Sequence, residues 1–304
     1  VERSRGLGDV YKRQVDASDL PLNVSRELLQ EHQLVDVIKK SITKRALESL
    51  KNLKEKSVDD YKKFWNQYGL VIKEGPAEDL ENRELIASLL LFSSSALDSQ
   101  SEDHSLDDYI NRMKPEQNKI FYCVADTFEA AINSPHIEGL KSEGKEVLLL
   151  TDRIDEWLMA NLMEYKGKEL ANVAKEEIKP NEEKKISKSD QEIISKVKKH
   201  LGDKVSDVIV SSRLVDSASC ILLPKHEPGS QLRKILEAAG QDIASSQPIF
   251  EINLKHKLLK KLNTMKGKQF NSFVDFLYDY AIIAEGGSPR DPAKYLRQLD
   301  KYLV

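Results

Sequence analysis

Apolar residues recur at helical spacing through the first third of the chain. From Val35 to Leu53 they fall every three or four positions, which predicts one long amphipathic helix. The members of this stripe are Val35, Ile38, Ile42, Leu47, Leu50 and Leu53. Four aromatic residues follow at a similar period and predict a second helix with one aromatic face: Tyr61, Phe64, Trp65 and Tyr68. The stretch from Glu84 to Phe92 is apolar enough to predict a third, buried helix.

The pattern changes near residue 120. Residues 120–124 form a short β-branched and aromatic run, and 147–150 form a second apolar run. Between them lie two helical stretches, interrupted by Ser134 and Pro135. A strand, a helical crossover and a second strand at this spacing predict a βαβ unit with parallel strands.

Residues 175–190 contain almost no hydrophobic side chains and carry mixed charge around Pro180. Such a segment cannot bury enough apolar surface to order itself, so it predicts a charged linker between two domains.

The last part of the chain begins with an amphipathic helix over 193–201. Strands are predicted over 205–211 and 219–223, and a helix over 231–239 that ends at Gly240. Two amphipathic helices close the chain, and little sequence is left to cover their apolar stripes. We expect a symmetric dimer that closes as a four-helix bundle, although both stripes could instead pack on their own domain. The interface residues predicted on the stripes are Phe273, Phe276, Leu277, Tyr280, Leu296, Leu299 and Leu303.

Composition adds limits to this picture. The 304 residues suffice for two or three domains, and the net charge is −3, which makes no general case for nucleic acid or an anionic membrane. Cys123 and Cys220 lie far apart in apolar stretches, which is typical of a cytoplasmic protein rather than a disulfide framework. Residues 1–14 lack periodicity and an initiator Met, and we interpret them as a leader of foreign origin.

The motifs of common enzymes are missing from the sequence. We find no phosphate loop, no dinucleotide-binding glycine pattern and no nucleophile elbow. The six histidines are scattered and are not paired at metal-ligand spacing, so no metal site is predicted. On its own residues the chain is not a recognisable enzyme.

Several segments carry a resemblance to a known family. Residues 15–30, Val-Asp-Ala-Ser-Asp-Leu-Pro-Leu-Asn-Val-Ser-Arg-Glu-Leu-Leu-Gln, closely resemble the catalytic loop in the middle domain of the ninety-kilodalton heat-shock family. Residues 119–126, 133–136 and 146–157 resemble further middle-domain segments, the last two in their bacterial form. Residues 212–220 and the closing helix resemble the family's dimerisation domain.

The resemblance implies a helix-rich α+β fold. Residues 15–172 would be the C-terminal part of the middle domain, with the catalytic loop, helices and a small βαβ layer. Residues 173–190 would be the charged linker, and 191–304 an α+β dimerisation domain ending in helices. The family's N-terminal ATPase domain, with its adenine pocket and magnesium site, is not in this sequence. We therefore expect no cofactor here and no ATP hydrolysis by this chain alone, whereas intact relatives use ATP and magnesium.

The resemblance also assigns roles to residues. Arg26 matches the arginine that reaches the ATP γ-phosphate when the chaperone closes, because a planar guanidinium can follow the charge that builds on the phosphoryl oxygens. Gln30 matches its partner one helical turn on, and Asn23 lies in the loop just before. From the residues alone, a surface salt bridge would be the simpler interpretation of Arg26.

Two sites are predicted to contact client proteins. Glu156 and Trp157 lie at a polar edge, where an aromatic ring can adapt to unfolded chains. The second site is the amphipathic helix that carries Leu232, Ile235 and Leu236. Plain core packing is the alternative for both.

The expected partners are unfolded or partly folded client proteins, a second copy of the chain and possible co-chaperones, but no nucleic acid and no membrane. Two alternatives stay open. One is a helical scaffold without client binding; the other is an enzyme whose βαβ layer binds a small molecule near Cys123.

Overall fold

The computed structural model describes residues 33–97, 100–175, 187–224 and 247–303, together with the single residues 227, 233 and 240. The chain divides into two compact units, residues 1–52 and 53–304. The described part of the first unit belongs to helix α2 (Gln33–Lys56). This is the predicted long helix, and its charges suit the helix dipole: Asp36 lies in the first turn, and Lys54 and Lys56 in the last.

Helices α3 (Val58–Glu78) and α4 (Arg83–Leu89) follow and pack against each other. The predicted aromatic face of α3 is divided in the structure. Tyr61 and Trp65 are buried, whereas Tyr68 is 56% exposed and stacks on Phe64. The buried face therefore covers only part of the predicted stripe.

The first sheet has five strands in the order β1-β3-β2-β5-β4. Its strands are β1 (Ser93–Ser94), β2 (Lys119–Val124), β3 (Leu148–Leu150), β4 (Glu164–Tyr165) and β5 (Lys168–Asn172). The central strands β3, β2 and β5 are parallel, and the two edge strands are antiparallel to their neighbours. The predicted βαβ unit is confirmed, because β2 and β3 pair in parallel with Cys123 opposite Leu149.

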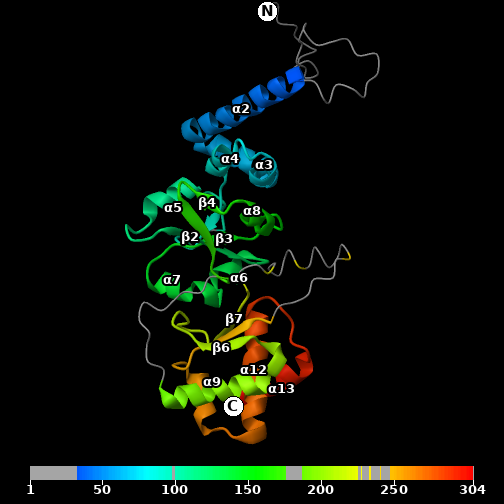
Figure 1. Cartoon of the computed structure of the whole chain (residues 1–304). Coiled ribbons are helices and arrows are strands. Elements are labelled where there is room, and N and C mark those ends of the chain that lie inside the picture. Colours follow the sequence, from blue (N-terminus) through cyan, green and yellow to red (C-terminus); the bar gives the residue numbers. More distant parts are fainter. Residues whose placement is uncertain are drawn as a thin grey trace, which may run out of the picture. The chain divides into compact units, whose positions relative to one another are not determined.

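Short helices surround this sheet in Figure 1. They are α5 (Leu106–Arg112), α6 (Phe128–Ile132), the 3-10 helix η2 (Pro135–Ile137), α7 (Glu138–Ser142) and α8 (Asp155–Asn161). Ser105 caps α5 in a complete capping box with Asp108, and Thr127 caps α6. Ser134 and Pro135 divide the crossover into two helical pieces, as predicted, since Pro135 starts the 3-10 turn.

The β4–β5 hairpin turns on two residues with positive φ, Lys166 at 48° and Gly167 at 72°. Two positive φ values at the centre of a two-residue loop match the twist of the flanking strands. Lys166 is the only non-glycine residue of the described chain in this region of backbone space.

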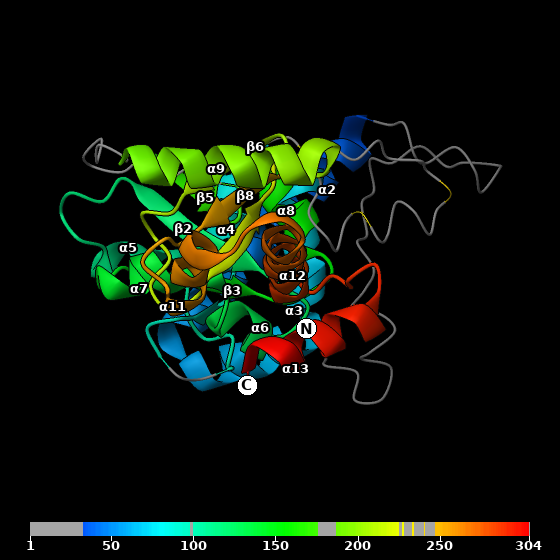
Figure 2. The same ribbon diagram turned by 90° about the horizontal axis from the view of Figure 1, so that it is seen from below.

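The second sheet has three strands in the order β6-β8-β7, formed by β6 (Asp207–Val210), β7 (Ser219–Leu222) and β8 (Ile249–Ile252). Its described helical neighbours are α9 (Lys188–Leu201), η3 (Gly202–Lys204), α11 (Lys257–Lys260), η4 (Lys261–Thr264), α12 (Gly267–Ala284) and α13 (Pro292–Leu303). Helix α12 packs on β7, and α9 packs on β6; Figure 2 views these helices from below. One apolar core joins the sheet to α9, α12 and α13.

The helix-rich α+β fold predicted from the sequence is confirmed by these two mixed sheets and their helices. Most of the predicted linker and of the predicted helix 231–239 lies outside the described residues. Within the described chain, no helix combines the length and apolarity needed to cross a membrane.

Candidate functional site

Trp157, which was predicted from the sequence to contact client proteins, lies on α8. Its side chain is partly exposed, whereas its neighbours Leu158 and Met159 are buried. The Trp157 carbonyl accepts a hydrogen bond of 2.9 Å from the Asn161 side chain at the end of the same helix. The tryptophan therefore sits on the open side of a short helix whose other side belongs to the core.

Glu156, predicted beside it, is buried at 7% exposure. Its charge acts on Lys175, whose pKa is lowered by burial while Glu156 opposes that shift. The two predicted contact residues are thus unequal: Trp157 is accessible, and the Glu156 carboxylate is turned into the protein. The role of both in client binding stays a prediction.

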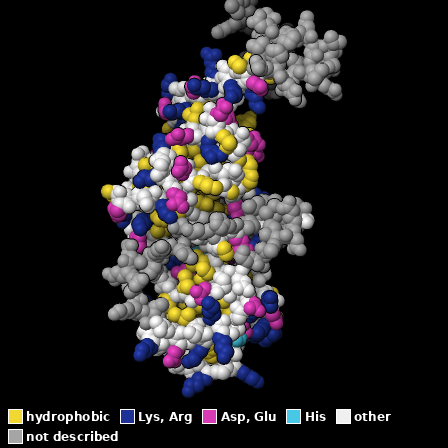
Figure 3. All heavy atoms as spheres, viewed as in Figure 1, with side chains coloured by type: hydrophobic (Ala, Val, Ile, Leu, Met, Phe, Trp, Pro, Cys, Tyr) yellow, Lys and Arg dark blue, Asp and Glu magenta, His cyan; other side chains and the backbone are white. Residues whose placement is uncertain are grey.

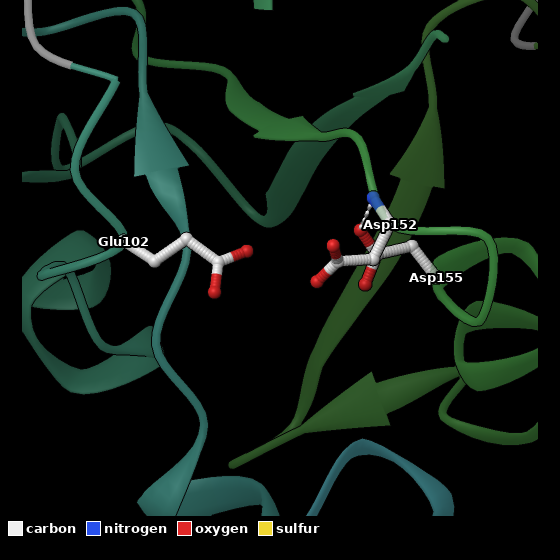
Figure 4. Close-up of side chains that lie close together, drawn as sticks. All are labelled: Glu102, Asp152 and Asp155. Carbon is white, nitrogen blue, oxygen red and sulfur yellow. Dashed lines mark hydrogen bonds between the residues drawn. The ribbon is translucent and has the colours of Figure 1, made fainter. Parts of the chain in front are cut away.

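A buried lysine anchors the start of α8 to α3. The Lys73 side chain is completely buried, and its Nζ lies 2.8 Å from Glu102 Oε1, 2.6 Å from Asp152 Oδ2 and 2.9 Å from Asp155 Oδ1. Asp155 is the first residue of α8. Its other carboxylate oxygen accepts a hydrogen bond of 2.9 Å from the Asp152 backbone N–H. Figure 4 shows the Glu102 carboxylate facing those of Asp152 and Asp155.

Aromatic rings complete the surroundings of the Lys73 ammonium. It lies 5.9 Å from the Trp65 ring centroid and 5.6 Å from that of Phe92, within the range of cation–π attraction. The Trp65 indole N–H donates to Glu102 Oε2 at 2.7 Å. The Lys73 and Asp155 side chains are completely buried, and so their charges attract one another more strongly than on the surface.

These contacts shift the ionisation of the buried groups. Burial by itself would lower the pKa of Lys73, but the three carboxylates outweigh it and raise the pKa. Burial raises the pKa of Asp155 to about 6, against the opposing effect of Lys73.

The carboxylates Glu102, Asp152 and Asp155 lie close enough together to suggest a metal site. However, the Lys73 ammonium contacts all three, and an ion placed among them would have to displace it. We therefore interpret the group as a four-residue ion cluster that fixes α8 in place.

Lys73 was not predicted from the sequence, although a signal was present. Tyr61, Trp65, Gly69, Lys73 and Pro76 recur at helical spacing and form the buried face of α3. A lysine on an otherwise apolar face requires buried acidic partners. What the sequence could not supply was their identity, since the acids come from residues 102, 152 and 155.

A second buried network joins two segments that lie far apart in the sequence, residues 133–136 and 212–220. Arg213 Nε donates to Glu251 Oε2 at 2.9 Å, and Nη1 donates to the Val173 carbonyl at 2.7 Å. Its Nη2 lies 2.9 Å from His136 Nδ1, and His136 Nε2 lies 2.5 Å from Glu285 Oε1. The motif of residues 133–136 thus meets that of residues 212–220.

Glu138 adds further hydrogen bonds between the segments around residues 136 and 213. One of its carboxylate oxygens accepts backbone N–H bonds from Val215, Asp216 and Ser217 at 2.7, 2.9 and 3.2 Å. Gly139 follows, and a Cβ there would meet the Arg213 backbone oxygen at 2.9 Å. A close backbone approach therefore requires glycine at this position.

The predicted dimer residues on α12 lie in the core of their own half of the chain. Phe273, Phe276 and Leu277 are buried, and the Ser219 hydroxyl of β7 donates to the Leu277 carbonyl at 3.0 Å. Packing of these three residues on their own domain accounts for their burial.

The rest of the predicted interface is more open. Leu296 on α13 is 57% exposed, and Tyr280 and Leu299 are partly buried. The Leu303 side chain lies outside the described residues. The dimer interface stays a prediction, carried by the accessible residues of α12 and α13.

Two further groups of predicted site residues lie outside the described residues. These are Asn23, Arg26 and Gln30 in the loop that resembles a catalytic loop, and Leu232, Ile235 and Leu236 in the second client-contact candidate. Cys123, considered for an enzyme site, is buried in β2, and burial raises the pKa of its thiol to about 12. A thiol of this kind stays protonated at neutral pH and is a poor nucleophile.

Comparison with known proteins places the chain in a family. A family model described as Hsp90 protein matches residues 11–304. A relative named Chaperone protein HtpG from Burkholderia ambifaria is 46% identical over 302 residues, which cover 95% of this chain and 48% of the relative. The protein of the same name from Legionella pneumophila strain Paris is 42% identical over 297 residues, with the same coverage. This chain spans about half the length of the relatives it matches. It belongs to the Hsp90 protein family.

Proposed function

We propose that this chain is the client-binding and dimerising portion of a molecular chaperone. The observation that carries the proposal is the match of 95% of the chain to relatives named Chaperone protein HtpG. In an intact protein of this kind, two copies would form a clamp driven by ATP. Arg26 would contact the γ-phosphate, with Gln30 and Asn23 beside it, because a guanidinium stabilises charge on a transferring phosphoryl group.

Trp157 supports the client-binding part of this proposal. Its ring is partly exposed, and the helix that carries it is fastened through Asp152 and Asp155 to a buried lysine. A rigid helix holds the ring in place, so little conformational entropy is lost when a client binds. A partly exposed aromatic ring can contact many different apolar segments.

The test compares two aromatic residues of different predicted role. Suppression of the aggregation of a heat-denatured reporter enzyme is measured for Trp157→Ala and for Tyr68→Ala, which removes an exposed aromatic ring on α3. We expect Trp157→Ala to weaken suppression about tenfold, because an interface aromatic anchor contributes about 1–2 kcal/mol or more. Tyr68→Ala should leave suppression unchanged.

Circular dichroism of both variants establishes that the fold is retained. Equal suppression by wild type and a folded Trp157→Ala would remove this tryptophan from the client site. Equal losses in both variants would indicate a nonspecific effect of surface hydrophobicity and would favour the scaffold alternative.

A further inference from the structure

A groove of about 650 Å³ lies between α9 and the turn that leads into α12. Its floor is apolar and belongs to the core of this half of the chain: Ile193, Leu262 and Phe270 are buried, and Met265 packs against them. The groove involves neither α8 nor α13, so it is separate from the Trp157 site and from the exposed face of Leu296.

Lysines border this groove on both sides. Lys196 and Lys199 come from α9, and Lys266 precedes α12; all three side chains are exposed. Lys196 has a loose ion pair with Glu192 at 3.7 Å. Within the described chain, no carboxylate pairs with Lys199 or Lys266. Two positive charges at the rim are therefore available to a ligand.

The surrounding sequence extends this positive field. Residues 253–274 contain six lysines and no Asp or Glu, in a chain whose net charge is −3. Figure 3 shows Lys and Arg side chains gathered at the lower end of the view, over α9 and the turn before α12. Glu192 also lines the groove and pairs with Lys196, so the lining keeps a net positive charge and attracts ligands of the opposite sign.

The backbone at the groove adds to this preference. Lys266 is the N-cap residue of α12, and its side chain makes no capping hydrogen bond. The first N–H groups of an 18-residue helix thus lack a side-chain acceptor at the place where Lys266 and Gly267 line the groove. These groups and the helix dipole both favour a carboxylate.

We propose that this groove binds an acidic peptide segment of a partner protein, with apolar side chains of the peptide on the floor and its carboxylates on the lysines. A recessed apolar floor bordered by lysines favours an acidic peptide over other classes of ligand. Single-stranded nucleic acid needs accessible rings for base stacking, whereas Phe270 is buried. Membrane binding needs protruding apolar side chains, and here the apolar side chains are recessed. A second copy that presented the same patch would bring lysine against lysine.

The test uses a fluorescein-labelled synthetic peptide with a repeating Glu-Glu-Leu pattern and the whole chain. Fluorescence anisotropy measures its affinity for wild type and for Lys199→Glu/Lys266→Glu. We expect the double reversal to weaken binding about tenfold or more, because two rim attractions become repulsions. The matched control, Lys51→Glu/Arg297→Glu, makes the same change of charge at exposed positions outside the groove and should bind as wild type does.

A third variant, Asn271→Trp, places a bulky ring at the groove lining without changing the charge. It should also weaken the binding of the peptide. The proposal is overturned if wild type does not bind the peptide, or if both double reversals weaken it equally. It is also overturned if polyuridine RNA or phosphatidylserine vesicles bind more tightly than the peptide and lose binding with Lys199→Glu/Lys266→Glu. None of these results depends on aggregation suppression, so the proposed chaperone function is judged separately.

Discussion

Lys73 illustrates how a single residue can fix a functional element. An unpaired ammonium at a completely buried position would cost several kcal/mol, and three carboxylates within 2.9 Å remove that cost. Because Asp155 is the first residue of α8 and Asp152 lies just before the helix, the ion pairs that stabilise Lys73 also orient the helix that carries Trp157.

We expect Lys73→Met to lower the free energy of unfolding by about 3–5 kcal/mol at pH 7, because three acids lose their buried partner. The loss should shrink as the pH falls towards 5. Without Lys73 the pKa of Asp155 rises further from about 6, and protonation of this carboxyl then relieves the repulsion. Urea unfolding at both pH values measures the difference.

Lys63→Met is the control for this variant. Lys63 lies on the same helix, but it is exposed and pairs with Asp60 at the surface. This substitution should leave stability nearly unchanged. Equal effects of the two substitutions would mean that the buried cluster contributes no more than a surface pair.

At the scale of elements, strongly periodic segments could be predicted from sequence and weakly patterned ones could not. The strand over residues 120–124 and the run over 147–150 are β-branched or apolar, and both were predicted. In contrast, β5 reads Lys-Glu-Leu-Ala-Asn, which is rich in helix formers. It is a strand because it pairs with β2, Ile120 opposite Leu170, and a single segment contains no information about that partner.

The predicted dimer interface on α12 shows that a single sequence does not identify which segments meet in space. Its apolar stripe was recognised, but the sequence could not say which side a partner covers. In the structure Tyr302 of α13 packs on Phe273 and Phe276, and the Ser219 hydroxyl of β7 donates to the Leu277 carbonyl, so only a part of the stripe is left for another chain. Likewise, Arg213 stood within a quoted motif, but its contacts with His136 and Val173 depend on the tertiary fold.

The junction between β8 and the segment after β6 should give stability a distinctive pH dependence. Burial would raise the pKa of Glu251, but Arg213 outweighs it and holds the pKa below 4.5. A lowered carboxyl pKa stabilises the fold above the unfolded-state value, and this contribution is lost as the pH falls through the folded-state pKa. Between pH 7 and 5, Glu251 in the wild type should therefore contribute little slope.

Arg213→Met should reverse this behaviour. Glu251 is left buried without its partner, so the free energy of unfolding falls by about 3–5 kcal/mol at pH 7. Its pKa then lies above the unfolded value, and stability should rise as the pH is lowered from 7 to 5. Urea unfolding across this range measures the slope. Adding Glu251→Leu to Arg213→Met should recover much of the lost stability. An unchanged pH slope in Arg213→Met, with no recovery in the double variant, would mean that Glu251 is not the buried partner of Arg213.

At the scale of the whole molecule, segments far apart in sequence meet at a few buried polar contacts. Lys73 contacts Glu102, Asp152 and Asp155. Arg213 contacts His136, Val173 and Glu251. Polar networks of this kind lose stability when one member is removed, and they fix one arrangement of the elements. The predicted client residue Trp157 lies on α8, whose first residue, Asp155, belongs to the Lys73 network, and Glu285 at the end of α12 joins the Arg213 network through His136.

Dimer formation is the property of the whole molecule that the exposed face of α13 predicts. Leu296→Asp places a charge at a side chain that is 57% exposed, so the fold should tolerate it. In a dimer whose interface buries this leucine, an unpaired carboxylate would oppose association and raise the dissociation constant about tenfold or more. Light scattering over a concentration series measures the mass of both proteins.

Leu80→Asp supplies the comparison, since Leu80 is 65% exposed and lies in the connection between α3 and α4. It should leave the mass at twice that of one chain, while Leu296→Asp should lower it towards one chain at the same concentration. Substitutions of Phe276 or Leu277 cannot replace this test, because these side chains are buried within one chain and their loss would unfold it. A wild type that stays monomeric throughout would mean that the apolar residues of α12 and α13 serve only their own core.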